Sequence, residues 1–335
     1  MDEEIRLANK ETGPNAIRIN DEELLLVLKD IVLSHWQITD NKEFFPAPQP
    51  VSLERRDLSK LIDYDYLVCA KSDGMRFLLV CYEGSSYMVD RAFKFYKVKL
   101  NFKGLEVDGK LGGIFDGELV LSKQGKWQYV IHDCINMQGK DVSKNMFPVR
   151  YAEITKLVAD IWIPNGSEFR IITKQFFNFK QLELLNRLIN EDKLDHKTDG
   201  LIFTPKNKKV GSHTQYDLFK WKPRNLHTFD FKINKSLEGI TAFVNKNGLH
   251  VPYANAPYGS PEEKIFLEGL SQNCKEFINN CIVECDYDDE ADTYRPIKLR
   301  LDKTHPNSFY TVKKTLGNIK ENITVDELIE LTQTN

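Results

Sequence analysis

The sequence predicts an α+β protein in which a larger domain built on antiparallel sheet precedes a smaller all-strand barrel. Three observations favour this class. The 335 residues suffice for two domains with separate cores. Through the first two thirds of the chain, short apolar runs alternate with glycine-containing turns and a few amphipathic stretches. From residue 229 onward strand-like runs dominate, and the composition changes near Pro223. We therefore place the domain boundary between residues 225 and 226.

In the first domain, apolar spacing predicts a few helices between strands rich in β-branched and aromatic residues. Residues 1–20 show little pattern, and we expect partial disorder at their start. The expected helices are 24–36, 151–161 and 178–189, and the expected strands are 66–70, 77–82, 127–135 and 169–174.

The second domain, residues 226–321, combines about five strands with one short helix at 261–270. This content suits a small OB-type barrel, and a generic β-sandwich is the alternative. Asn247-Gly248 predicts a tight hairpin turn. The stretch 324–331 has the apolar spacing of a helix that docks on another element. The expected strands are 229–233, 239–245, 249–253, 281–287 and 297–301.

The composition argues against a broad electrostatic grip on nucleic acid. Lys and Arg total 46 against 49 Asp and Glu, a net charge of −3, so any contact with RNA is expected to be local. No signal-peptide pattern or run of eighteen apolar residues occurs, so we expect an intracellular protein without membrane attachment. The six cysteines lack Cys-x-x-Cys spacing, which favours reduced core thiols over zinc ligands or disulfides.

Lys71 is the candidate nucleophile. The segment Lys71-Ser72-Asp73-Gly74 lies between two apolar strand-like runs, and Asp73-Gly74 predicts a hairpin turn. A lysine at the rim of such a hairpin has a fixed backbone and an accessible amine, as covalent catalysis requires. An exposed lysine that only aids solubility is the alternative.

Four further stretches follow Lys71-Ser72-Asp73-Gly74-Met75-Arg76 along the chain. They are Asp116-Gly117-Glu118, Asp199-Gly200-Leu201-Ile202, Lys220-Trp221-Lys222-Pro223 and Arg300-Leu301-Asp302-Lys303. In this order the five stretches resemble the signature of the covalent nucleotidyltransferases. That superfamily comprises mRNA capping guanylyltransferases and ATP-dependent DNA and RNA ligases.

The spacing within two of these stretches predicts charged side chains on one face of a strand. Lys220 and Lys222 share one face of a strand, where they would place positive charge near a triphosphate and near Lys71. Asp116 and Glu118 likewise share a face, and with Asp199 they would hold a divalent metal or ribose hydroxyls. Exposed lysines and acids on a solvated face are the alternative.

Within the superfamily the details resemble the capping enzymes. Lys220-Trp221-Lys222-Pro223 and Asp302-Lys303, followed by Pro306-Asn307, are similar to capping-type motifs. Val51-Ser52-Leu53-Glu54-Arg55 and the stretch 321–328 resemble the monofunctional enzymes of large DNA viruses. The resemblance implies a nucleotidyltransferase domain at 1–225, on which residues 322–335 pack back, and an OB-fold domain at 226–321. It implies transfer of GMP from GTP, through a lysyl-N-GMP intermediate at Lys71, to a 5′-diphosphate RNA end.

The resemblance also assigns site residues. Ser72 and Lys174 would read guanine O6, Arg76 and Glu118 would bind the ribose, and Arg91 a phosphate. His132 stands where an aromatic ring usually stacks on the base, with a core histidine as the alternative. Arg300, Asp302 and Lys303 would reach the β- and γ-phosphates only when the domains close. The implied nucleotide-binding set is completed by Asp73, Asp199, Lys220 and Lys222, and the implied ligands of Mg²⁺ or Mn²⁺ are Glu118 and Asp199.

The implied partners are GTP and 5′-diphosphate RNA ends, with an RNA triphosphatase, a cap methyltransferase or an RNA polymerase as separate chains. We expect a monomer, acting in the nucleus or in a cytoplasmic viral factory. Two alternatives stay open: an ATP-dependent polynucleotide ligase, and a non-enzymatic module that binds RNA ends or a polymerase.

Overall fold

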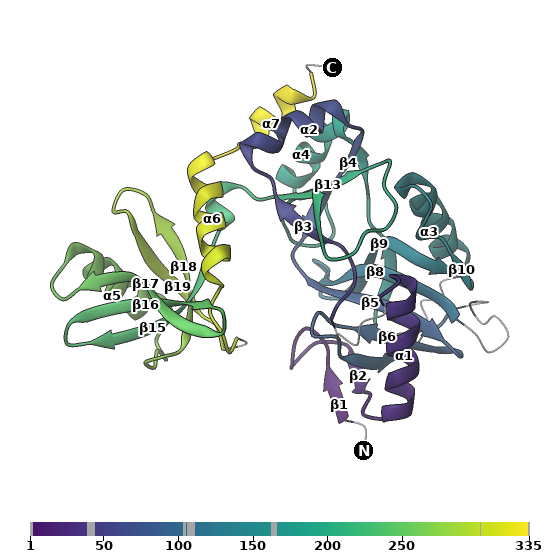
Figure 1. Ribbon diagram of the computed structural model, residues 1–335, viewed down its shortest axis with the longest axis horizontal. Coiled ribbons are helices and arrows are strands. Elements are labelled where there is room, and N and C mark those ends of the chain that lie inside the picture. Colours follow the sequence, from purple (N-terminus) through teal and green to yellow (C-terminus); the bar gives the residue numbers. More distant parts are fainter. Residues whose placement is uncertain are drawn as a thin grey trace. The chain divides into compact units, whose positions relative to one another are not determined.

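The computed structural model describes residues 3–38, 44–102, 105, 111–161, 166–301 and 303–333 (Figure 1). The chain forms two compact units. One comprises Met1–Trp221 with Val325–Asn335, and the other Lys222–Thr324. Both units combine antiparallel sheet with helices, which confirms the predicted α+β class.

The larger sheet of the first unit has nine strands among the described residues, in the order β1-β2-β7-β6-β5-β8-β9-β10, with β11 parallel to β9. The first two strands occupy the segment in which we expected partial disorder, so that expectation is wrong where the chain is described. The strands are β1 (Glu3–Arg6), β2 (Asn15–Arg18), β5 (Met75–Tyr82), β6 (Ser85–Val89), β7 (Phe95–Val98), β8 (Leu111–Leu121), β9 (Trp127–Met137), β10 (Lys140–Asp141) and β11 (Arg170–Thr173).

Both faces of this sheet are buried, which explains the unbroken apolar run in β5. Phe77 and Leu79 join a core that includes Ile154 of α3, whereas Leu78 joins the opposite core with Leu28 of α1. Figure 1 shows the two helices beside the sheet. Because successive strand residues face opposite sides, burial of both faces removes the polar alternation. The helices are α1 (Glu22–His35) and α3 (Phe147–Ile161).

The second sheet of this unit has the order β12-β4-β13-β14-β3. Helices α4 and α7 contact each other near it, and Arg55 donates two hydrogen bonds to Glu327 of α7, at 2.6 and 3.1 Å. The terminal helix thus docks on the first unit. The elements are β3 (Gln49–Ser52), η1 (Arg55–Asp57), α2 (Leu58–Asp63), β4 (Tyr66–Ser72), β12 (Phe177–Asn178), η2 (Phe179–Gln181), α4 (Leu182–Asn190), β13 (Thr198–Pro205), β14 (Thr214–Trp221) and α7 (Val325–Leu331).

The segment that follows Lys71 corrects the predicted hairpin. Strands β4 and β5 belong to different sheets, so Asp73-Gly74 carries the chain from one sheet to the other. The Asp73 N–H donates to Lys197 O at 2.9 Å, which extends the pairing of β4 with β13. A Cβ at Gly74 would lie 2.5 Å from Leu119 O, so this glycine permits close passage over β8. Local composition signals a turn but does not specify which sheet the next strand joins.

The second unit is a five-stranded antiparallel sheet in the order β17-β16-β15-β18-β19. Along the chain, α5 lies between the third and fourth strands, β17 and β18. This topology fits the predicted OB fold. Asn247 and Gly248 both have positive φ, 54° and 84°, as a type I′ turn requires. Helix α6 was not expected, and it begins where the Ser308 side chain accepts from Thr311 N. The elements are η3 (Arg224–Leu226), β15 (Phe229–Ser236), β16 (Gly239–Lys246), β17 (Leu249–Pro257), α5 (Pro261–Asn273), β18 (Ile282–Asp288), β19 (Thr293–Leu299) and α6 (Phe309–Glu321).

All six cysteines are free thiols, and only Cys281 is not fully buried, which agrees with the predicted core thiols. Of the helices that the structure describes, none has the length and apolar character needed to cross a membrane.

Candidate active site

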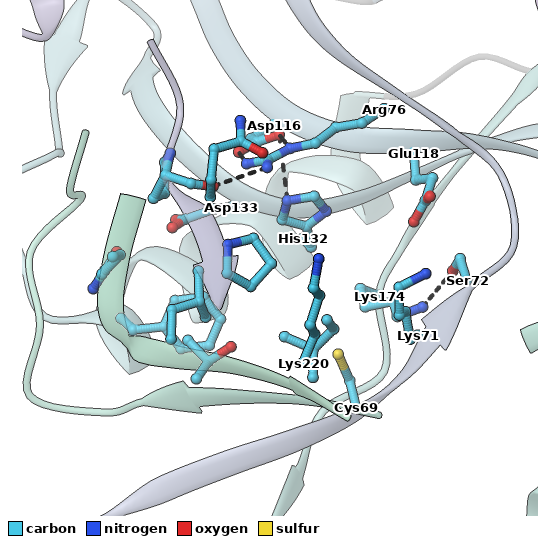
Figure 2. Close-up of a pocket in the computed structure, with 18 of the residues that line it drawn as sticks. Cys69, Lys71, Ser72, Arg76, Asp116, Glu118, His132, Asp133, Lys174 and Lys220 are labelled. Carbon is cyan, nitrogen blue, oxygen red and sulfur yellow. Dashed lines mark hydrogen bonds and ion pairs between the residues drawn. The ribbon is translucent and has the colours of Figure 1, made fainter. Parts of the chain in front are cut away.

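A cavity of about 370 Å³ in the first unit is lined by residues of both sheets (Figure 2). Its volume suits a ligand of nucleotide size. Much of the site predicted from the sequence lies here, although its members are spread over more than 140 residues of chain. The lining includes Lys71, Ser72, Arg76, Arg91, Glu118, His132, Lys174 and Lys220.

Lys71 lies near the end of β4, and its Nζ is 2.6 Å from Asp199 Oδ1 on the neighbouring strand β13. The pairing of β13 with β4 shifts register between Thr198 and Leu201, where Gly200 has φ 146°. A bulge re-aims the side chains beside it, and glycine permits this backbone. The Asp-Gly stretch therefore places a carboxylate directly against the candidate nucleophile.

Glu118 on β8 brings a second carboxylate to this part of the cavity. Figure 2 shows it pointing toward the side where Lys71, Ser72 and Lys174 gather. Burial raises the pKa of Glu118, although the charges of Lys174 and Lys71 oppose that shift. The side chain is thus partly desolvated and surrounded by cations.

Arg76 and Asp116 form a buried ion pair. Arg76 Nε and Nη2 donate to the two Asp116 oxygens at 2.9 and 2.5 Å, and Nη1 donates to Pro48 O at 2.8 Å. His132 Nε2 lies 3.3 Å from Asp116 Oδ1. Although burial opposes ionisation, the charges of Arg76 and His132 hold the pKa of Asp116 well below its usual range.

Asp116 therefore has a different role from the one its spacing suggested. A register shift between Asp116 and Gly117 interrupts the pairing of β8 with β9, so the two acids of this stretch have different surroundings. Both Asp116 oxygens are engaged by protein groups, which does not support a place in a metal site.

Ser72 forms the centre of a second polar cluster. Lys174 Nζ donates to Ser72 Oγ at 2.5 Å, and His196 Nε2 lies 2.8 Å from the same oxygen. Burial, followed by repulsion from Lys71, lowers the pKa of Lys174. The structure thus joins Ser72 and Lys174, which we predicted to act on one atom of the base.

Several predicted residues lie elsewhere. Asp73 is exposed and does not line the cavity as described. Lys222, Arg300 and Lys303 belong to the second unit, and Asp302 lies outside the described residues. Within that unit, buried Asp230 pairs with Arg300 at 3.0 Å and also with Lys303. Their predicted nucleotide contacts stay predictions.

Sequence reasoning missed two features of the site. Arg150 donates to both oxygens of Asp133, at 2.7 and 2.8 Å, and both residues line the cavity. His196 contacts Ser72 from 124 positions along the chain. No local sequence pattern marks a partner so distant. The sequence signal nearest to His196 is the Asp199-Gly200 stretch that follows it.

Comparison with known proteins agrees with this architecture. A family model described as "mRNA capping enzyme, catalytic domain" matches residues 19–224, and one described as "mRNA capping enzyme, C-terminal domain" matches residues 226–329. The mRNA-capping enzyme subunit alpha of Schizosaccharomyces pombe is 31% identical over 321 residues, covering 85% of this chain and 79% of that protein. The subunit of the same name from Saccharomyces cerevisiae is 26% identical over 361 residues, covering 86% and 78%.

Among solved structures, "mycobacterial DNA ligase D complexed with ATP and MES" covers 79% of this chain and 98% of that chain, at 12% identity and a TM-score of 0.42.

The fold is that of a nucleotidyltransferase domain followed by an OB-type domain. The chain belongs to the mRNA capping enzyme family, so the predicted family is confirmed. The predicted likeness to viral enzymes stays a prediction.

Proposed function

We propose that this chain is an mRNA guanylyltransferase that uses Lys71 to carry GMP from GTP to a 5′-diphosphate RNA end. The observation that carries the proposal is the Lys71 amine, which lines a nucleotide-sized cavity and is held at 2.6 Å by Asp199. Membership of the capping enzyme family supports the choice of reaction.

Two displacements at phosphorus make up the reaction. In the first, Lys71 Nζ forms a bond to the α-phosphorus of GTP, the bond to the bridging oxygen breaks, and pyrophosphate leaves. In the second, a terminal oxygen of the RNA diphosphate attacks the same phosphorus, the P–N bond breaks, and the lysine nitrogen regains a proton. The products are a GpppN cap and free Lys71.

Asp199 has two tasks in this scheme. The amine must lose a proton before it attacks, and Asp199 is within hydrogen-bonding distance of Nζ. Its carboxylate also fixes the direction of the Lys71 side chain. The bulge at Gly200 positions Asp199. The stretch that contains Lys71 and the Asp199-Gly200 stretch therefore act together in the proposed reaction.

The other cavity residues would hold GTP. Ser72 and Lys174 are proposed to contact guanine O6, Glu118 and Arg76 the ribose, and His132 the face of the base. Lys220 points toward His132 from the opposite sheet (Figure 2), where its charge suits a phosphate. Burial and the nearby Arg76 lower the pKa of Arg91, which is proposed to bind another phosphate.

The carboxylates fit a divalent metal only in part. In the described part of the chain no group of three or more metal-ligating side chains occurs. Mg²⁺ and Mn²⁺ are commonly held by one or two carboxylates together with substrate phosphates, and Glu118 and Asp199 both lie beside Lys71. Such an ion would neutralise charge that develops on the α-phosphate.

We propose that Arg300, Asp302 and Lys303 act on the β- and γ-phosphates when the domains close. Asp230 holds Arg300 and Lys303 in the second unit, so phosphate oxygens would have to replace this carboxylate as their partner. The proposed acceptor is a 5′-diphosphate RNA end, and the proposed state is a monomer.

Labelled GTP and labelled ATP, each incubated with the protein and Mg²⁺ or Mn²⁺, test the function. We expect a covalent protein adduct from GTP that is labile in acid and stable in alkali, as a phosphoramidate is. The adduct should pass its GMP to diphosphate-ended RNA. An adduct formed from ATP in preference to GTP would indicate a ligase instead.

A further inference from the structure

The proposed reaction makes no use of His196, although its ring contacts a residue that lines the cavity. Lys174 Nζ, Ser72 Oγ and His196 Nε2 form a continuous chain with separations of 2.5 and 2.8 Å. Lys174 and Ser72 are both buried and both line the cavity. His196 is thus separated from a bound ligand by one side chain.

The backbone around His196 is fixed to both sheets. Asp195 O accepts from Lys123 N at 2.7 Å, and Lys197 O accepts from Asp73 N at 2.9 Å. His196 itself forms an isolated bridge with Ser122, just after β8. Its ring is therefore placed by the fold, as a residue that orients another group must be.

Hydrogen-bond directions follow from the chemistry of the three groups. The Lys174 ammonium only donates, so Ser72 Oγ accepts from it. Burial and the charge of Lys174 lower the pKa of His196 to about 4, so the ring is neutral and carries one N–H. The Nδ1 atom is buried, and the described residues offer it no partner.

The position of that N–H decides what Ser72 can do. A proton on Nδ1 would bury a donor without an acceptor, which folded proteins rarely tolerate. A proton on Nε2 donates to Ser72 and leaves only a lone pair unmatched at Nδ1. The network therefore assigns the Nε2–H tautomer. Ser72 Oγ then accepts twice, and no described residue accepts its own O–H.

We propose that His196 is a positioning residue that turns the Ser72 hydroxyl into a donor toward the cavity, so that the site accepts a 6-keto purine and rejects a 6-amino purine. This inference rests on the proposed function, because it assumes that Ser72 meets position 6 of the base. A keto oxygen accepts from the hydroxyl. An amino group donates, and it would meet an oxygen whose lone pairs are already used. Unmatched polar groups of this kind discriminate strongly between substrates.

The test compares adduct formation from GTP with that from 2,6-diaminopurine riboside triphosphate. The two nucleotides share the 2-amino group and differ at position 6 and in the N1 proton. The quantity measured is the ratio of kcat/KM for the two. His196→Leu removes the donor to Ser72, whereas His196→Gln retains an amide N–H at a similar reach. Ser72→Ala provides the background in which His196 has nothing left to orient.

We expect wild type to favour GTP strongly and His196→Leu to lower the ratio by at least roughly ten-fold, with His196→Gln within about three-fold of wild type. In the Ser72→Ala background, His196→Leu should leave the ratio unchanged. Equal losses with both nucleotides in His196→Leu would show a merely structural role and overturn the inference. If His196→Leu fails to fold, His196→Gln decides: a kcat/KM ratio as low as that of Ser72→Ala overturns the inference. A wild type without a GTP adduct would instead remove the proposed function, and this inference with it.

Discussion

Two ion pairs lie at the same cavity and differ in depth. In the Arg76–Asp116 pair, the arginine side chain is 15% exposed and the carboxylate 2% exposed. In the Lys71–Asp199 pair, the corresponding values are 23% and 19%. In the deeper pair Arg76 donates to both Asp116 oxygens and also to Pro48 O, whereas in the shallower pair Lys71 donates to Asp199 Oδ1. The deeper pair suits a scaffold, and the shallower pair can exchange partners during a reaction.

The energetic reason is desolvation. Removal of one partner from a buried pair leaves an unpaired charge in a medium of low polarity, which costs about 3–5 kcal/mol. A pair with more contact with water is partly hydrated when it breaks, so its loss costs less than that of the deeper pair. The two pairs should therefore respond oppositely when stability and chemistry are measured separately.

The largest expected effect is on chemistry at the shallower pair. Lys71→Arg and Lys71→Ala should abolish the covalent GMP adduct, because arginine stays protonated and alanine has no nitrogen. The free energy of unfolding should fall by less than it does when a partner is removed from the deeper pair, since Lys71 and Asp199 have more contact with water. Gel detection of labelled adduct checks the first point and denaturant titration the second. An adduct in either variant would show that another residue is the nucleophile.

The next effect is on stability at the deeper pair. Asp116→Ala should lower the free energy of unfolding by about 3–5 kcal/mol, because Arg76 remains buried and charged. Asp199→Ala is the matched control and should lower the free energy of unfolding by less than Asp116→Ala does. All four tryptophans lie within Met1–Trp221, so their fluorescence reports unfolding of this unit. If Asp116→Ala and Asp199→Ala lowered the free energy of unfolding equally, the two ion pairs would not differ in their structural roles.

These pairs also show what the sequence could and could not predict. The motifs that supply Lys71, Glu118 and Asp199 were identifiable because each is local, and most helices and strands follow from their apolar spacing. Asp116 is buried beside a register shift in β8, and the contact of His196 with Ser72 spans 124 positions. Interactions set by tertiary packing produce no periodic pattern in the sequence. The hairpin predicted after Lys71 failed for the same reason, since composition does not assign a strand to a sheet.

Variants of His132 test whether its ring stacks on the base or only supports the Arg76–Asp116 pair. Its ring is 28% exposed, lines the cavity and contacts Asp116 at 3.3 Å. If the ring stacks on guanine, His132→Phe should hold or improve apparent GTP affinity, and His132→Ala should weaken it by about 1–3 kcal/mol. Both variants lose the contact with Asp116, so both should lose about 0.5–1.5 kcal/mol of stability. If only stability changes in His132→Ala, the ring belongs to the scaffold alone.

The last expected effect is a difference in pH response between the deeper pair and His196. The pKa of His196 in the folded protein is about 4, below the ordinary value of 6.5, so between these values the unfolded chain binds the extra proton. This contribution to stability is complete above about pH 6.5 and is lost as the pH falls toward 4. The charged groups that act on the ring are Lys174, Asp195 and Lys123.

The pKa of Asp116 is depressed instead, so its contribution persists above the ordinary value of 3.8 and is lost only below it. Between pH 7.5 and 4.5, wild type should therefore lose about 1–2 kcal/mol more stability than His196→Gln, after allowance for solvent screening of the half-buried ring. In a His132→Phe background, where no imidazole contacts Asp116, the offset caused by Asp116→Asn should stay constant over the same range. Denaturant midpoints of these proteins at several pH values measure both quantities, and titrating groups that contact neither His196 nor Asp116 cancel in the differences. A pH-independent offset for His196→Gln would mean that the ring is protonated alike in the folded and unfolded chains, which would contradict its burial as a neutral group.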